Sequence, residues 1–168
     1  MSIRIIKQFL PDEYERIRRM AVMRQRSKDA YGIADGRMIA NGIDAHVLGL
    51  AGEFAVAELF GGALDARTRL GGDDGAPDIE LPNGETINVK TRREAGYSFL
   101  LTPGHTQLGA DYGVLCWTLK QTPAHPLAVE IVGIISDADF DQACERMEFG
   151  HGPRIGVRPQ VMRKVVKP

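Results

Sequence analysis

The segment from Pro77 to Arg93 constrains the fold more than any other part of the chain. Within it, an Asn83–Gly84 pair stands between two short runs in which apolar and polar residues alternate. Such a pair between alternating runs is the strongest short-range signal for a β-hairpin. The sequence therefore predicts two antiparallel strands joined by a tight turn at Asn83–Gly84.

The two faces of this predicted hairpin differ in chemistry, because successive side chains of a strand point to opposite faces. One face is apolar and carries Ile79, Leu81, Ile87 and Val89. If that face packs on the core, the opposite side gathers Asp78, Glu80, Asn88 and Lys90. Carboxylates, an amide and an ammonium on a small sheet are typical of a divalent-metal site with a charge-stabilising lysine.

A further carboxylate lies on a helix that is predicted to run from Asp44 to about Phe60. The residues of this helix are apolar nearly all round, so we expect it to be buried. Glu53 would then be a buried charge, which is costly unless it binds a metal or pairs with a cation. We favour the metal site; the alternative is a salt bridge to an arginine at the helix edge.

The order of these residues resembles that of the PD-(D/E)xK nuclease superfamily, which includes restriction-endonuclease-like, Holliday-junction-resolvase-like and phage-type enzymes. In that family an Asp and a later (D/E)-x-Lys lie on adjacent strands, often with a Glu from a preceding helix. Asp78, Lys90 and Glu53 match these positions, and the resemblance covers roughly residues 44 to 135. One position departs from the pattern: Asn88 stands where the family usually has Asp or Glu.

The resemblance implies hydrolysis of DNA phosphodiester bonds with Mg²⁺ or Mn²⁺ as cofactor. Asp78 and Glu53 would be metal ligands together with the backbone carbonyl of Val89. Lys90 would orient or deprotonate the attacking water and stabilise the developing charge. Asn88 would complete the catalytic set, because its amide oxygen can bind a metal although it brings no negative charge.

The missing carboxylate leaves three outcomes open. The protein could be an active one-metal enzyme, an enzyme whose site is completed by another carboxylate, or an inactive nuclease fold. Glu80 is the nearest substitute on the hairpin, and Asp73 and Asp74 in the preceding loop are others. We favour activity, because Asp78, Lys90 and Glu53 are all present.

The predicted architecture is one domain of the α/β (α+β) class over residues 1–168, with a restriction-endonuclease-like core. A central mixed sheet of four to five strands flanked by helices is expected within residues 44–147. Strands are predicted at 97–101, 112–120 and 127–135, and a capping box at Ser136 and Asp139 predicts a short helix to Met147. A basic N-terminal helix and loop (1–43) and a basic tail (148–168), which wraps the surface or adds an edge strand, flank this core.

Basic residues flank the acidic centre, although the net charge of −1 gives no overall basicity. DNA is the expected partner, and the candidate phosphate contacts are Arg92, Arg93, Arg18, Arg19, Arg163 and Lys164. The alternative is that the helix arginines form a solvated face and that Arg92 and Arg93 balance the acidic loop. A homodimer is expected from the resemblance, because cleavage of a duplex needs two sites.

Two other classes of function compete with the nuclease. The first is a catalytically inactive protein of the same fold that binds nucleic acid or regulates, and the second is an interaction protein whose hairpin polar groups are merely solvated. Cys116 and Cys144 lie in apolar runs and indicate reduced core residues rather than a disulfide framework. With no apolar run of membrane-spanning length and no signal-peptide pattern, we expect a cytoplasmic protein with no membrane partner.

Overall fold

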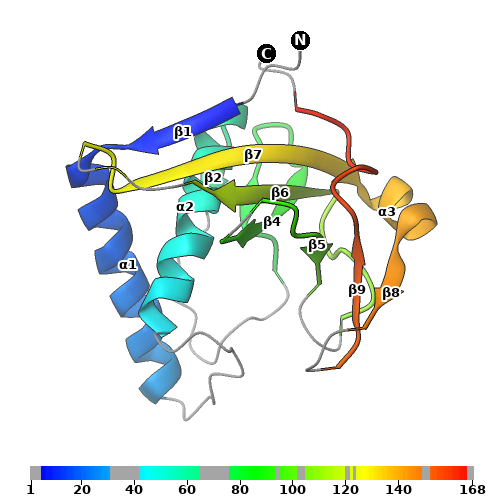
Figure 1. Ribbon diagram of the computed structural model, residues 1–168, viewed down its shortest axis with the longest axis horizontal. Coiled ribbons are helices and arrows are strands. Elements are labelled where there is room, and N and C mark those ends of the chain that lie inside the picture. Colours follow the sequence, from blue (N-terminus) through cyan, green and yellow to red (C-terminus); the bar gives the residue numbers. More distant parts are fainter. Residues whose placement is uncertain are drawn as a thin grey trace.

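The computed structural model describes residues 5–30, 42–64, 76–93, 95–101, 105–119, 122, 124–148 and 152–165. Three helices and nine strands are present in this part of the chain (Figure 1). In chain order they are β1 (Ile5–Phe9), α1 (Pro11–Ala30), α2 (Gly42–Phe60), β2 (Ala63–Leu64), β3 (Ile79–Glu80), β4 (Thr86–Arg92), β5 (Phe99–Leu100), β6 (Tyr112–Thr118), β7 (Leu127–Ser136), α3 (Asp137–Ala143), β8 (Glu145–Met147) and β9 (Arg154–Val157). None of the described helices combines the length and apolarity that crossing a membrane requires.

The main sheet is mixed and curled, with strand order β1-β7-β6-β4-β3-β2 (Figure 1). Only β4 and β6 run parallel, and the other neighbouring pairs are antiparallel. The mixed α and β class is therefore confirmed, but the expected number of four to five strands is wrong, since the sheet has six. The strands that the sequence analysis missed, β1 and β2, lie at its two edges, where one neighbour stabilises a short or half-polar segment.

Helices α1 and α2 cover one face of the main sheet. Ile17 and Ala21, which lie on one side of α1 at helical spacing, are buried in the core that α2 and the sheet form. On the sheet side this core receives Ile87 and Val89 of β4, which confirms the apolar face of the hairpin. Phe9 of β1 belongs to the same core, so the N-terminal segment packs with the rest of the fold.

A smaller sheet of order β5-β9-β8 lies with α3 over the other face of the main sheet. Figure 1 shows these elements on the side of the view opposite to α1 and α2. Leu115 of β6 faces this second core, whereas Cys116 faces the first, so β6 is apolar on both faces as predicted for an interior strand. The predicted strand at 97–101 is present as β5, but it pairs with β9 rather than joining the main sheet.

The expected helix ending at Met147 is shorter than predicted. Ser136 caps α3 as expected, because its side chain accepts a hydrogen bond from Asp139 N at 3.2 Å. The helix nevertheless ends at Ala143, Cys144 is extended, and the next residues form β8. Pairing of β8 with β9 thus outweighs the helical spacing of the apolar residues; β9 is the central strand of this sheet, not an edge strand. Cys116 and Cys144 are both free thiols.

The predicted turn at Asn83–Gly84 lies in the five-residue connection between β3 and β4. Gly84 N donates to Leu81 O at 2.9 Å, and Leu81 N donates to Glu85 O at 2.8 Å. Gly84 has a φ of +84°, a conformation that glycine adopts without strain. The resulting register places Ile79 opposite Ile87. The residue before β3, Asp78, therefore also lies beside β4.

The packing of α2 on β4 depends on Gly52, and we expect Gly52→Ala to lower the free energy of unfolding by about 2 kcal/mol. A Cβ atom at this position would overlap Thr91 Oγ1 and lie 3.2 Å from Val89 Cγ1. Urea denaturation measures the loss, and Gly49→Ala on the same helix is the control. The nearest atom to a Cβ there is Glu53 Oε1 at 3.9 Å, so alanine should be neutral or stabilising by up to about 1 kcal/mol. Equal stability of the two variants would contradict the close approach at Gly52.

Candidate functional site

The hairpin places Asp78 against the open edge of β4. Asp78 N donates to Ile87 O at 3.0 Å, and Asp78 Oδ2 accepts a hydrogen bond from Val89 N at 2.7 Å. Backbone N–H and C=O groups of alternate strand residues point to the same side. The Val89 carbonyl is therefore directed to the same edge as the Asp78 carboxylate, which is the arrangement that a shared metal ligand set requires.

Asp78 is an electrostatically strained carboxylate. Its pKa is raised to about 6, first because burial disfavours the charged form and then because the negative charge of Glu53 lies close by. The positive charges of Lys90 and Arg24 and the hydrogen bond from Val89 N act in the opposite direction. The charges of Glu53 and Lys90 therefore both act on Asp78, and so does that of Arg24, a residue that the sequence did not suggest for the site.

Arg24 of α1 forms a bidentate ion pair with Glu53 of α2. Its Nη1 and Nη2 donate to Glu53 Oε1 and Oε2, each at 3.0 Å. The Glu53 side chain is only 8% exposed and that of Arg24 is 25% exposed, so the pair is largely shielded from water. The salt bridge that the sequence analysis kept as the alternative for Glu53 is therefore present, and the metal-ligand role of Glu53 stays a prediction.

A sequence signal for Arg24 existed but was not used. Ile17 and Ala21 define the buried stripe of α1, and Arg24 follows Ala21 by three residues, so it continues the same face. This spacing places Arg24 on the core side of α1, but it does not identify the acidic residue that Arg24 meets.

Asn88 and Lys90 lie on the opposite face of β4 from Ile87 and Val89, as the alternation predicted. Asn88 Nδ2 donates to Leu108 O at 2.6 Å, which fixes the side chain against the segment before β6. A carboxylate in this rotamer would face the carbonyl oxygen and repel it, which gives a physical reason for Asn at this position. Only Asn88 Oδ1 is left to bind a metal.

Of the carboxylates considered as substitutes, only Glu80 lies in the part of the chain that the structure describes. Glu80 is exposed on β3, and its charge is not among those that act on the pKa of Asp78. Asp73 and Asp74 lie outside the described residues. Among the described residues no group of three or more His, Cys, Asp or Glu side chains is placed to hold a metal ion.

The residues at the site still fit one divalent metal. After burial, the negative charge of Glu53 is the second cause of the raised pKa of half-buried Asp78, and a metal cation near both carboxylates would relieve that repulsion. The Val89 carbonyl adds a third hard oxygen donor at the same edge. Mg²⁺ commonly uses one or two protein carboxylates and keeps several waters, so this donor set suits it.

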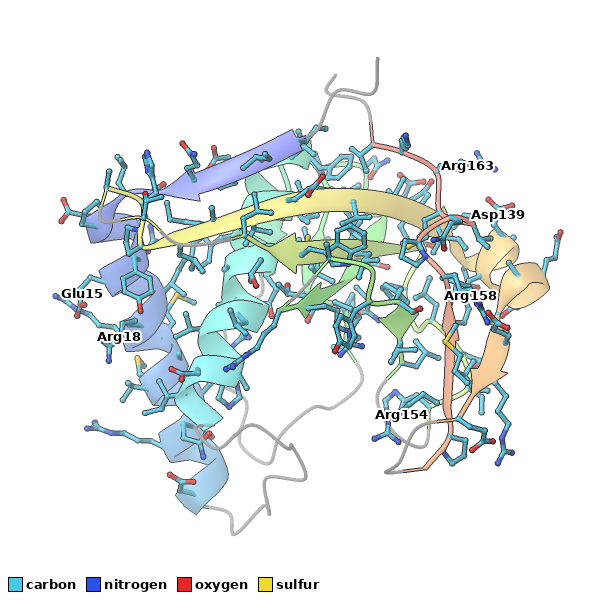
Figure 2. The ribbon with its side chains drawn as sticks, viewed as in Figure 1. Glu15, Arg18, Asp139, Arg154, Arg158 and Arg163 are labelled. Atoms are coloured by element: carbon cyan, nitrogen blue, oxygen red, sulfur yellow. The ribbon has the colours of Figure 1, made fainter. Side chains whose placement is uncertain are left out.

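The predicted phosphate contacts are dispersed. Arg92 is half-buried beside β5, and Arg93 next to it is exposed. Arg18 lies on the outer side of α1 and Arg163 at the far side of the molecule (Figure 2). Arg19 pairs with Glu15 at 3.5 Å, Arg163 pairs with Asp139 at 2.8 Å, and Lys164 is exposed. The structure does not gather these residues into one surface, so Arg92 and Arg93 are the predicted contacts closest in the chain to the site.

No family model matches this chain, and no curated protein matches it significantly.

Proposed function

We propose that the protein is a metal-dependent nuclease that hydrolyses DNA phosphodiester bonds, built on a restriction-endonuclease-like core. The observation that carries this proposal is the half-buried Asp78 carboxylate, whose side chain bonds Val89 N of β4 and whose pKa is affected by the charges of both Glu53 and Lys90. These are the residues that resemble the nuclease signature in the sequence. A merely solvated hairpin face would not need a half-buried carboxylate with a raised pKa.

Each residue has a defined part in this chemistry. Asp78 and Glu53, with the Val89 carbonyl, would hold Mg²⁺ or Mn²⁺, which supplies positive charge to the phosphoryl oxygens and makes a nearby water more acidic. Lys90 lies close enough to Asp78 to lower its pKa, and its ammonium can orient the attacking water and stabilise the growing phosphoryl charge. Asn88, held by Leu108, adds a neutral donor and acceptor beside Lys90.

The second candidate is an inactive protein of the same fold that binds nucleic acid or regulates. The ion pair between Arg24 and Glu53 favours it, because the guanidinium occupies both oxygens of a carboxylate that the metal would need. The hydrogen bond that Asn88 Nδ2 donates to Leu108 O also favours the inactive candidate. Such a protein would bind DNA with strong salt dependence and without need of a metal.

A cleavage assay separates the two candidates, and we expect nicking of plasmid DNA in Mg²⁺ or Mn²⁺ that EDTA abolishes. Asp78→Ala and Lys90→Ala should each reduce the rate by at least about a hundredfold, because each removes a group that acts on the reacting atoms. Asp141→Ala, an exposed carboxylate on α3, is the control and should cleave like the unaltered protein. Salt-sensitive binding without cleavage in either metal would support the inactive candidate instead.

A further inference from the structure

Arg92 is held in one position by backbone groups. It follows Lys90 by two residues on the same face of β4, about 6.6 Å further along the strand. Its Nε donates to Ser98 O at 3.3 Å and its Nη2 donates to Leu100 O at 3.2 Å. These bonds use part of the guanidinium fork and orient the remaining N–H groups, so Arg92 is a fixed cation at the end of β4.

Arg154 is brought to the same region by the second sheet. β9 pairs with β5 so that Gly156 lies opposite Leu100, one of the two residues whose carbonyls hold Arg92. In Figure 2 the Arg154 side chain extends from the lower end of β9 to the side away from β8, whereas Arg163 lies at the other end of the molecule. Arg158 is exposed and pairs with Glu145 of β8. Burial lowers the pKa of Arg92, and the charge of Arg154 lowers it further, which is the effect of a second cation close by.

Neither guanidinium has an ion-pair partner within the described part of the chain. Arg154 Nη1 donates to Pro153 O at 3.3 Å, and the bonds of Arg92 also go to carbonyls. Several other arginines of the described chain form ion pairs with carboxylates. These pairs are Arg24–Glu53, Arg146–Glu148, Arg158–Glu145 and Arg163–Asp139. Two adjacent guanidinium groups without a carboxylate repel each other, and a bound anion would remove that cost.

We propose that Arg92 and Arg154 form a phosphate-binding site between β4 and β9. Guanidinium groups bind phosphate oxygens bidentately, and the fixed orientation of Arg92 suits that geometry. Since Arg92 and Lys90 share one face of β4, a phosphate at this site would lie next to the candidate catalytic residues. Assigning that phosphate to a nucleic-acid strand rests on the proposed nuclease function, whereas binding of a free phosphate ion does not.

The test compares Arg154→Ala with the unaltered protein, because within the described part of the chain the Arg154 side chain bonds only the carbonyl of the adjacent Pro153. Fluorescence anisotropy with a short labelled DNA strand in EDTA should show affinity about tenfold lower for Arg154→Ala. The slope of log affinity against log salt should fall by about one, as expected when one phosphate contact is lost. Arg154→Lys should retain part of the affinity for DNA. Arg158→Ala, which removes an exposed arginine paired with Glu145, should change that affinity less than about twofold.

A second measurement separates the two sources of phosphate. Inorganic phosphate should raise the melting temperature of the unaltered protein relative to chloride at equal ionic strength, and Arg154→Ala should lose that increase. If this dependence on Arg154 is found but DNA binding is the same in both proteins, the site is real and the nucleic-acid assignment is wrong. If Arg154→Ala matches the unaltered protein in both measurements, or if the unaltered protein binds neither phosphate nor DNA, the proposal is overturned.

Discussion

Replacing Arg24 by methionine is expected to lower the free energy of unfolding by about 3 kcal/mol, measured by urea denaturation in EDTA. Glu53 is 8% exposed and has both oxygens bonded to Arg24, so the variant would leave a buried charge without its partner. The neighbouring charge of Asp78 adds to the cost, because without Arg24 the two carboxylates repel each other more strongly. The partial exposure of Arg24 keeps the expected loss near the lower end of the range for buried pairs.

Two further variants test whether the loss comes from Glu53. Arg24→Met combined with Glu53→Gln should recover much of the stability, since an amide is far less costly to bury than a carboxylate. Arg19→Met makes the same change on the same helix in an exposed pair, where Arg19 and Glu15 are 77% and 53% exposed. It should cost no more than about 0.5 kcal/mol. A similar loss of unfolding free energy in Arg24→Met and Arg19→Met would show that the Arg24–Glu53 pair contributes no more to stability than the exposed pair does.

Arg24→Met also tests whether Asp78 and Glu53 bind a metal ion. If Asp78 and Glu53 are ligands, removing Arg24 frees the Glu53 carboxylate, and Mg²⁺ should restore part of the lost stability. Adding Asp78→Asn to Arg24→Met should abolish that recovery. Stability of Arg24→Met that does not respond to Mg²⁺ or Mn²⁺ would argue that Arg24 is the permanent partner of Glu53, as in the inactive candidate.

Local signals predicted the hairpin, because its turn and its alternation lie within one short segment. The Asn83–Gly84 turn, the apolar face and the cap at Ser136 are all set by residues within a few positions of each other. The burial of Glu53 was predicted for the same reason, since α2 is apolar nearly all round.

Contacts between distant segments could not be predicted in this way. Arg24 and Glu53 are separated by 29 residues, and the helix that carries Arg24 is charged on its other faces. The pairing of β5 with β9 joins segments more than fifty residues apart, so nothing local marked Phe99–Leu100 as part of a second sheet. For Asn88, the deciding partner is a backbone carbonyl, that of Leu108, and a sequence does not encode where a carbonyl will lie.

Replacing Asp78 by asparagine is expected to stabilise the metal-free protein at neutral and basic pH while it abolishes cleavage. The pKa of Asp78 is raised from the usual 3.8 to about 6, so the folded state binds its proton more tightly than the unfolded chain does. For a carboxyl group shifted in this direction, stability falls as pH rises from the unfolded pKa to the folded pKa. A shift of this size corresponds to about 3 kcal/mol of destabilisation once the group is fully charged.

Asparagine has no charge to desolvate, and its side-chain oxygen can still accept the hydrogen bond that Val89 N donates to Asp78. The difference in melting temperature between Asp78→Asn and the unaltered protein should be small at about pH 4 and should grow to several degrees at about pH 8.

Asp111 provides a control of opposite sign, because hydrogen bonds from Thr86 hold its pKa below the usual value. Asp111→Asn should therefore not raise the melting temperature at basic pH. If Asp78→Asn does not raise it either, Asp78 is not a strained carboxylate. A pH-dependent gain combined with loss of cleavage would show that the protein keeps, at a cost in stability, a charge that its chemistry needs.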